Sequence, residues 1–416
     1  MWPACPVWRP DGLFAVPADR KRKSRFVAPL SVYLDANASE PVRPEAMAAL
    51  QEVVREPGNP SSLHRAGRGA RDRQETARET LAMLYGAGPD EVIFTSGGTE
   101  ADSLAVHVLG EGRRLLLGAT EHPALLSCRP DAELIGVDRE GVTDLHDLEA
   151  RLAQGGEALV CLMLANNETG VIQPVAEVAA LCRQYGALLH VDAAQAAGRM
   201  AVSMRTLDAD SMALSAHKLG GVPGVGALLL RDAAHRDVRP LMKGGGQERG
   251  WRGGTPALPA ISAFAAAARA AMQTDEQGGA WGRLIEWRDR LEQAATMAGA
   301  VVAGRGARLG RLPNTSCLIL PDVAAQRQVM ALDLAGIQVS AGSACSSGKV
   351  ARSHVLAAMG FGQQAGEAIR VSLPWNVTEA DVQAFMDAYA TMASRLRPEP
   401  SSKPFPFSVS HPISAR

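Results

Sequence analysis

The sequence predicts an α/β fold in which a mostly parallel sheet is covered by helices, followed by a smaller α/β region. Short apolar runs of β character alternate with periodic helical segments from Glu45 onward. A long Ala-rich segment follows Ala260, and β runs return after it. Such alternation is typical of parallel strands connected by helical crossovers. With 416 residues, the chain is long enough for a large domain and a smaller partner.

The elements follow in order along the chain. The first β-like run lies in "SVYLDANASEP" and stops at Asp35 and the turn-forming Asn37. After Ala260 we expect an Ala-rich helix, then an amphipathic helix from about Trp281 to Met297. The strands expected in the larger region are Val92–Thr95, Arg114–Leu117, Leu159–Leu164, Leu188–Val191, Ser211–Leu214 and Ala227–Leu230, and those in the smaller region lie near Cys317–Leu320 and Ile369–Leu373.

These segments divide the chain into a large domain, 44–276, and a small domain made of 31–43 with 277–396. Residues 1–30 contain "RKRKSR" without the apolar core of a secretory signal. We interpret them as a disordered basic extension or the result of an upstream start codon, in preference to an organelle presequence. Residues 397–416 have the Pro/Ser bias of a flexible tail.

Composition favours small-molecule chemistry. The formal net charge of −1 provides no broad basic surface for nucleic acid. The longest apolar stretch is interrupted by Arg269, so we predict no membrane span. Six cysteines form no C-x-x-C pair and no metal spacing with histidine, which indicates a reducing compartment and no metal site.

A Gly-rich turn between an expected strand and helix is a candidate phosphate site. In "FTSGGTEADSLA", a Ser-Gly-Gly turn follows the expected strand, and Thr99 is placed to cap the next helix. Backbone N–H groups and the positive end of the helix dipole then converge on one point that suits an anion. Taken alone, the pattern is more often a plain capped turn, so it needs support elsewhere.

Two neighbouring strand ends supply that support. One strand delivers Asp192, with Gln195 a turn later, and the next delivers Ser215, His217 and Lys218. The carboxyl ends of strands are where open α/β sheets place ligand contacts. An aspartate here is also a common helix cap, and a single lysine is more often a surface residue. A lysine that follows an apolar strand is partly desolvated, which favours the neutral amine that attacks carbonyls.

A phosphate cradle, an aspartate and a lysine are the three anchors of a pyridoxal phosphate site. The lysine forms the Schiff base, and the aspartate keeps the pyridine nitrogen protonated. An ion pair about 4 Å apart at an effective dielectric of ~20 is worth about 4 kcal/mol, or roughly three pKa units before desolvation. His122 and Asn167 also follow expected strands, although either residue alone could be a turn residue or a cap.

The stretch "SAGSACSSGK" places Cys345 among small residues that cannot bury much apolar area. A cysteine in an exposed, flexible segment is more often reactive than structural. We therefore treat Cys345 as a candidate nucleophile. His354 is close in sequence but falls on an expected helix, which makes a cysteine hydrolase the weaker interpretation.

At this point the chain resembles a group I cysteine desulfurase, the NifS/IscS type, within the class V aminotransferase family. The resemblance runs from about Tyr33 to Leu373 and implies the fold of type I pyridoxal-phosphate-dependent transferases. The matching stretches, in family order, are "YLDANA", "GNPSSLHRAGR", "FTSGGTEADSLA", "TEHPA", "NNETG", "HVDAAQAAG", "SAHKLGGVPGVG", "GGGQERGWRGGT", "SAGSACSSG" and "IRVSL".

The resemblance also implies a role for each candidate residue. Lys218 would bind the cofactor covalently, Asp192 would pair with its ring nitrogen, and Gln195 would contact its ring hydroxyl. His122 would stack on the ring and act as acid and base. Asn167 and Arg370 would receive the substrate carboxylate, Asn167 also lying at the cofactor. The residues implied at the phosphate are Gly98, Thr99, Ser215, His217 and, from a neighbouring subunit, Thr255.

The implied activity is sulfur removal from L-cysteine, giving L-alanine and a persulfide on Cys345. The protein would be a cytoplasmic bacterial homodimer that delivers sulfur to an acceptor such as an iron–sulfur scaffold. A class V aminotransferase and a selenocysteine lyase remain as alternatives, as does a non-catalytic sulfur scaffold. Where relatives commonly have Thr-Thr, this chain has Ser39 and Glu40, which we expect near the site entrance. Gln247 and Leu164 stand where relatives often have histidine.

Overall fold

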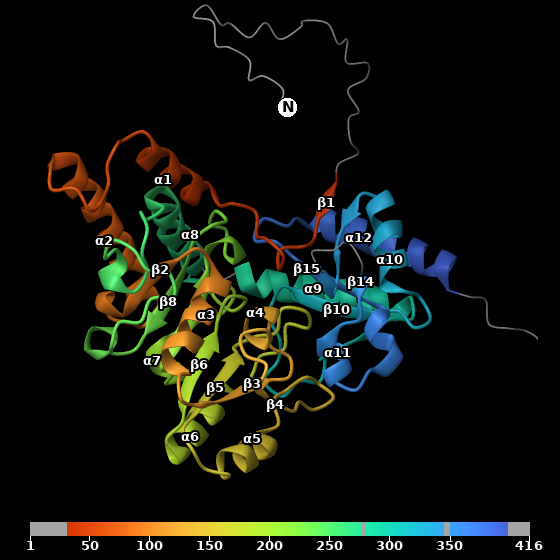
Figure 1. Ribbon diagram of the computed structural model, residues 1–416. Helices are drawn as coiled ribbons and strands as arrows, with labels where there is room; N and C mark the ends of the chain where they lie inside the picture. Colours follow the sequence, from red (N-terminus) through yellow and green to blue (C-terminus); the bar gives the residue numbers. More distant parts are fainter. Residues whose placement is uncertain (1–30, 277–279, 345–349, 398–416) are drawn as a thin grey trace, which may run out of the picture.

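A computed structural model describes residues 31–276, 280–344 and 350–397. A seven-stranded sheet forms the centre of its larger part (Figure 1). Neighbouring strands from β7 to β4 are parallel, whereas β8 runs antiparallel to both of its neighbours. In spatial order the strands are β2 (Val92–Thr95), β8 (Gly226–Leu230), β7 (Ser211–Ser215), β6 (Leu188–Asp192), β5 (Ala158–Met163), β3 (Arg114–Gly118) and β4 (Glu133–Ile135). The predicted mostly parallel sheet is confirmed.

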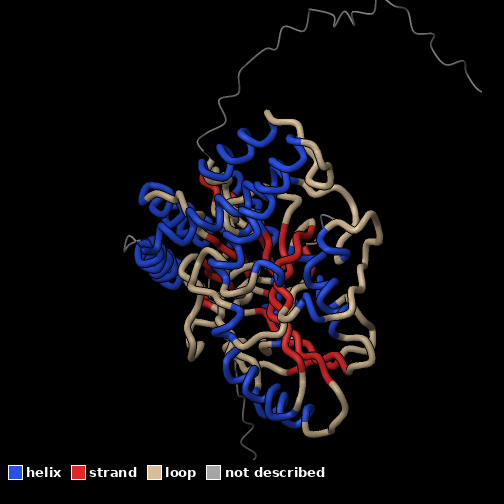
Figure 2. Tube along the Cα trace, turned by 90° about the vertical axis from the view of Figure 1, so that its left-hand side faces the viewer, coloured by secondary structure: helices blue, strands red, loops and turns tan. Residues whose placement is uncertain are grey.

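Helices cover both faces of this sheet, and Figure 2 shows the strands enclosed between them. Leu115 and Leu117 of β3 pack on the face covered by α3, whereas Leu116 packs on the face covered by α2, α6 and α8. Because successive side chains of a strand point to opposite faces and both faces are covered, most strand residues are apolar, which explains the nearly continuous apolar runs. The helices around this sheet are α1 (Pro44–Val54), α2 (Arg65–Tyr85), α3 (Gly98–Leu109), α4 (Pro123–Leu126), α5 (Leu145–Leu152), α6 (Val175–Tyr185), α7 (Met204–Leu207) and α8 (Leu258–Glu276).

A four-stranded antiparallel sheet organises the smaller part. Its apolar core contains residues from α9, α10 and α12 on the side of Leu318 and Ile369, and α11 packs near Cys317 and Ile319. The strands in spatial order are β12 (Ser340–Ala341), β15 (Ala368–Ser372), β10 (Thr315–Ile319) and β9 (Val301–Val302). The helices are α9 (Ala280–Met297), α10 (Ala325–Leu334), α11 (His354–Ala358) and α12 (Glu379–Leu396).

The beginning of the described chain joins this smaller part. β1 (Val32–Tyr33) pairs in parallel with β11 (Ile337–Gln338), and Asp35 forms a bridge with Ser372. A further short antiparallel pair consists of β13 (Ser343–Ala344) and β14 (Val350–Ala351). The segment after β1 then crosses to the large sheet, where α1 packs on α8.

The six strands expected in the large sheet are present, with bounds that differ by at most one residue. The three-residue strand β4 was not predicted. It lies at the sheet edge, Leu134 is exposed, and a short edge strand does not need the continuous apolar run that identifies the interior strands. Within the described ranges, no helix combines the length and apolar character needed to cross a bilayer.

A buried ion pair fixes the loop that leads to Thr255. Both carboxylate oxygens of Glu248 accept from the Arg78 guanidinium, at 2.8 and 2.9 Å. The same carboxylate accepts from Gln74 Nε2 at 2.6 Å and from the Phe94 backbone N–H at 2.9 Å. Glu248 has a φ of 47°, in the left-handed region that non-glycine residues rarely adopt. This hydrogen-bonded carboxylate therefore holds an otherwise unfavourable turn against α2 and β2.

Glu248→Gln should lower the free energy of unfolding by roughly 3–5 kcal/mol, since it removes the buried counter-ion of Arg78 and leaves only the partly exposed Glu75 beside that charge. Urea unfolding followed by circular dichroism measures the change. The matched control is Glu52→Gln, whose partner Arg73 is at a partly exposed surface site; we expect a change of about 1 kcal/mol or less there. Equal losses in the two variants would show that burial of the Glu248 pair is unimportant.

Candidate active site

Lys218 occupies a short turn directly after β7. Its Nζ donates to the main-chain oxygens of Asn37, at 2.6 Å, and Ala38, at 3.0 Å. Burial, assisted by the charges of Arg370 and Arg199, lowers the pKa of Lys218 to about 8. A sizeable share of this amine is therefore neutral near neutral pH, which is the form that attacks a carbonyl carbon.

Asp192 is the last residue of β6 and lies opposite Ala213 of β7 in the parallel register. Its side chain is buried, and Oδ1 accepts from the Ala194 backbone N–H at 2.8 Å. Burial, followed by repulsion from Asp102, raises the pKa of Asp192 to about 6. The charges of Asp192 and Lys218 interact, so the two neighbouring strands bring an acid and an amine to the same edge of the sheet.

A line of buried polar side chains lies behind Asp192. His190 Nε2 is 3.1 Å from Asp102 Oδ1, and His190 Nδ1 is 2.8 Å from Ser211 Oγ. Burial lowers the pKa of His190 to about 4, which favours the neutral ring. All three residues are buried, and the charges of Asp102 and His190 both influence the pKa of Asp192.

His122 caps α4, because its Nδ1 accepts from the Ala124 backbone N–H at 3.1 Å. A neutral ring with Nδ1 as acceptor carries its proton on Nε2. Burial lowers the pKa of His122, while the nearby Asp192 acts in the opposite direction and Lys218 and His354 act with burial. His122 therefore shares the electrostatic environment of Asp192 and Lys218.

The first turn of α3 lies against the ends of β6 and β7. A Cβ atom built on Gly98 would be 3.4 Å from Ser215 Cβ and 3.9 Å from Ala194 Cβ. The predicted Thr99 cap is wrong: Gly97 is the cap residue, and Thr99 lies inside the first turn with an exposed side chain. The helix begins at Gly98, two residues before the position that a Thr99 cap would imply, because Gly97 adopts an extended conformation that leads directly into α3.

Asn167 and Arg370 meet between the two sheets. Arg370 Nη1 donates to the Asn167 main-chain oxygen at 3.2 Å, and Nη2 donates to Asp35 Oδ1 at 2.7 Å. Arg370 Nε and Asn167 Oδ1 are buried and have no hydrogen-bond partner. A buried donor and a buried acceptor left unpaired are costly, so this position suits a ligand that supplies both an acceptor and a donor. An amino acid carries both groups.

Asn37 was predicted only as a turn residue, yet it connects much of the site. Its main-chain oxygen accepts from Lys218 and, at 3.1 Å, from Gln195 Nε2. Its side-chain Nδ2 donates to the Asn167 main-chain oxygen at 3.1 Å and to Thr315 Oγ1 at 2.9 Å. The only feature of the sequence that could have indicated a role for Asn37 in the site is its position soon after the first β-like run.

Several other predicted residues have clear positions. Ser215 ends β7, and His217 follows it, with Nδ1 3.4 Å from Ser39 Oγ. Thr255 is exposed in the segment before α8. Cys345 lies outside the described residues. The expectation for Glu40 is wrong: it is not at an entrance but buried, with 6% of its surface exposed, because it pairs with Arg199.

The donor set fits pyridoxal phosphate. A buried amine with a lowered pKa suits its aldehyde, the Asp192 carboxylate suits a pyridine N–H group, and the α3 N-terminus beside Ser215 suits its phosphate. The unpaired polar atoms of Asn167 and Arg370 provide an adjacent place for an amino acid. This combination is typical of enzymes that act on amino acids through that cofactor.

Comparison with known proteins agrees with this geometry. The family model described as aminotransferase class-V matches residues 32–385. A cysteine desulfurase of Cereibacter sphaeroides is 40% identical over 88% of this chain and 96% of its own length. An IscS-like cysteine desulfurase of Mycobacterium tuberculosis is 39% identical over 88% of this chain and 97% of its own length.

Solved structures lead to the same family. The NifS-like protein of Rickettsia africae superposes with a TM-score of 0.80 at 32% identity, covering 88% of this chain and 99% of that one. A structure described as SspA in complex with cysteine has a TM-score of 0.71 at 26% identity, covering 83% and 99%. The chain therefore belongs to the class V aminotransferase family, and the type I fold of pyridoxal-phosphate-dependent transferases is confirmed.

The lowered pKa of Lys218 predicts how fast the cofactor-free protein takes up pyridoxal phosphate. Because only the neutral amine attacks the aldehyde, the rate should rise with pH through a midpoint near 8. Stopped-flow absorbance over a pH series measures it. Lys218→Gln should abolish the lysine-linked absorption band, and Lys243→Gln, which removes an exposed lysine, should leave the profile unchanged. A midpoint near the ordinary lysine value of about 10.4 would contradict the desolvation of Lys218.

Proposed function

We propose that this protein is a cysteine desulfurase that uses pyridoxal phosphate to remove sulfur from L-cysteine. The observation that carries the proposal is the convergence of Lys218, Asp192 and the first turn of α3 at one edge of the sheet, in a chain whose relatives are named cysteine desulfurase. When bound, the cofactor withdraws electrons from the substrate and so activates its side chain.

Different residues of this chain would bind different parts of the cofactor. Lys218 would bind its aldehyde carbon, Asp192 its ring nitrogen and Gln195 its ring hydroxyl. His122 would cover one face of the ring. The residues proposed at the phosphate are Gly98, Thr99, Ser215, His217 and, from a second copy, Thr255.

Arg370 and Asn167 would bind the carboxylate of the substrate. Arg370 already pairs with Asp35, and its Nε atom still lacks an acceptor. The pair with Asp35 fixes the guanidinium plane in place before the substrate arrives. The similar structure described as SspA in complex with cysteine supports an amino acid of this kind as the ligand.

His122 and Cys345 would carry out the proton and sulfur chemistry. His122 presents an Nε2 proton when its ring is neutral, because Nδ1 is occupied by the Ala124 N–H. A bond forms between the thiolate sulfur of Cys345 and the substrate sulfur, and the substrate Cβ–S bond breaks. The electron pair of that bond stays with Cβ, which takes up a proton. The products are L-alanine and a persulfide on Cys345, so atoms and electrons balance without an oxidant.

The remaining parts of the proposal concern assembly and context. The chain would form a homodimer, because Thr255 is exposed in its own subunit and is proposed at the phosphate of another. Its two domains would be 44–276 and 31–43 with 277–396. It would work in the cytoplasm and pass sulfur to an acceptor protein such as an iron–sulfur scaffold. Formation of alanine, in place of a keto acid, separates this activity from that of an aminotransferase.

Cys345→Ser should retain the visible band of the bound cofactor and lose the persulfide, because the serine hydroxyl is a far weaker nucleophile than a thiolate. Incubation with cysteine followed by intact-mass analysis should show the mass of one added sulfur atom on the wild type and none on the variant. Cys128→Ser, which alters a half-buried thiol just after α4, serves as the control and should behave as the wild type. Undiminished sulfur on Cys345→Ser would overturn the assignment.

Arg370→Gln should raise the KM for cysteine by roughly 10–100-fold, because a charge-assisted hydrogen bond to a carboxylate is worth about 1.5–3 kcal/mol. Steady-state alanine formation measures the change. Arg352→Gln removes an exposed arginine of the small domain and should leave the KM unaltered. An unchanged KM in the Arg370 variant would place the substrate carboxylate elsewhere.

A further inference from the structure

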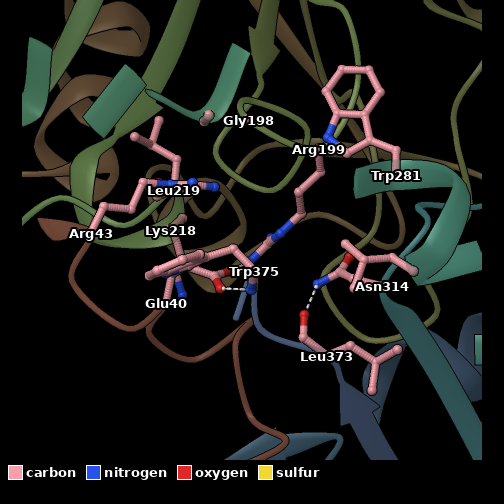
Figure 3. A pocket seen from close by; sticks show the side chains of 12 residues that line it. Glu40, Arg43, Gly198, Arg199, Lys218, Leu219, Trp281, Asn314, Leu373 and Trp375 are labelled. Carbon is pink, nitrogen blue, oxygen red and sulfur yellow. Dashed lines mark hydrogen bonds and ion pairs between the residues drawn. The ribbon is translucent and has the colours of Figure 1, made fainter. Parts of the chain in front are cut away.

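Glu40 and Arg199 form a buried ion pair beside Lys218. Glu40 Oε2 accepts from Arg199 Nη2 at 2.9 Å, and each side chain has only 5% of its surface exposed. Glu40 Oε1 accepts from the Trp375 backbone N–H at 2.7 Å. A guanidinium and a backbone N–H can only donate, so both carboxylate oxygens act as acceptors, which favours the anion. Burial raises the pKa of Glu40, and Arg199, the Trp375 N–H and Arg43 act in the opposite direction. The pair lines a small cavity, of about 20 Å³, that also touches Lys218 (Figure 3).

Arg199 connects this pair to Gln195. Arg199 Nη1 donates to Gln195 Oε1 at 2.5 Å and to the Gln195 main-chain oxygen at 3.2 Å. Because the guanidinium has no acceptor, the oxygen of the Gln195 carboxamide must face Arg199. The amide nitrogen is therefore turned to the other side, where it donates to the Asn37 oxygen at 3.1 Å.

This orientation of the carboxamide directs the amide nitrogen of Gln195 toward Lys218. The Asn37 oxygen accepts from both Gln195 Nε2 and Lys218 Nζ, so the two nitrogens converge on one atom. A carboxamide nitrogen carries two protons, and Asn37 uses one of them. The second N–H remains for an acceptor on whatever Lys218 binds.

We propose that Glu40 and Arg199 are positioning residues that hold the Gln195 carboxamide as a hydrogen-bond donor to the ring hydroxyl of the cofactor, while the Glu40 charge shields Lys218 from the Arg199 charge. This inference rests on the proposed function, since it takes pyridoxal phosphate as the group on Lys218. It assigns a task to Glu40, which replaces the threonine common in relatives and would otherwise be an unexplained buried acid.

The charges around Lys218 decide the sign of the effect. Arg199 and Arg370 favour the neutral form of the nitrogen of Lys218, and Asp192 and Asp35 favour its protonated form. The imidazoles of His122 and His217 also face Lys218. Loss of the Glu40 charge leaves Arg199 uncompensated, which makes protonation near Lys218 less favourable.

Other charged groups pack around Glu40 and contribute to the electrostatic potential at the same place. Arg43 lies near Glu40, donates through Nε to the Leu219 main-chain oxygen at 3.0 Å and stacks over Trp375 at 5.0 Å. The Glu40 charge is also one of the causes that raise the pKa of Tyr33. Arg43 is in turn influenced by Glu45 and Tyr85. Since Arg43 and Arg199 are both cations, Glu40 is the acid that faces them together.

The test is a pH titration of the visible absorption band of the purified holoprotein. The pH at which the band is half changed reports protonation of the Lys218 nitrogen that carries the cofactor. In Glu40→Gln we expect this midpoint to fall by about one pH unit, because a buried compensating charge is lost. Arg199→Met should move the midpoint in the opposite direction, since it removes the cation and frees the Gln195 carboxamide. Glu52→Gln makes the same charge change at an exposed site of α1, where the partner is Arg73, and should leave the midpoint at the wild-type value.

The possible results of the titration separate a failure of this inference from a failure of the proposed function. A midpoint that is unchanged in both variants would overturn the inference, and so would a loss of thermal stability without a spectral shift, because the pair would then be only a structural clamp. Shifts of the same sign in the two variants would also overturn it. If one variant does not fold, the sign of the shift in the other decides. A wild-type protein that remains colourless after saturation with pyridoxal phosphate would instead overturn the proposed function.

Discussion

The parallel pairing of β6 and β7 is the constraint on which the site depends. The register places Asp192 opposite Ala213, so the two strands end at the same edge of the sheet. Neighbouring strands lie about 4.8 Å apart, so residues that follow the ends of two such strands begin close together. Asp192 ends one strand and Lys218 follows the other, and the first turn of α3 lies against both ends. A shift of one residue in this register would turn Asp192 to the opposite face.

A second constraint joins the two parts of the molecule. The segment that follows β1 is paired with the small sheet, yet its Asn37 oxygen holds Lys218 and Gln195 of the large sheet. The Asn37 side chain is bound to Asn314 and Thr315 of the smaller part. The position of the reactive amine therefore depends on how the two parts are packed. Burial of this junction also explains why the amine, the acid and the imidazole of the site have displaced pKa values.

The sequence was sufficient for six of the seven strands of the large sheet and for the residues at their ends. The interior strands are read correctly because burial on both faces demands continuous apolar runs, as in β5. The approach failed where the determining contact is distant in sequence. Glu40 was expected near an entrance, but its partner Arg199 is 159 residues away. Thr99 was expected as a cap, but the local conformation of Gly97 determines where the helix starts. Neither a buried ion pair nor a backbone angle has a local sequence signature.

The central claim is that Lys218, facing Asp192, is the residue that binds the cofactor. Reduction of the holoprotein with borohydride, which fixes a pyridoxyl group to the lysine that carries it, followed by peptide mass mapping, tests it most directly. The account predicts a pyridoxyl group on Lys218 and an unmodified Lys243. A label on another lysine, or no label after saturation with pyridoxal phosphate, would contradict it.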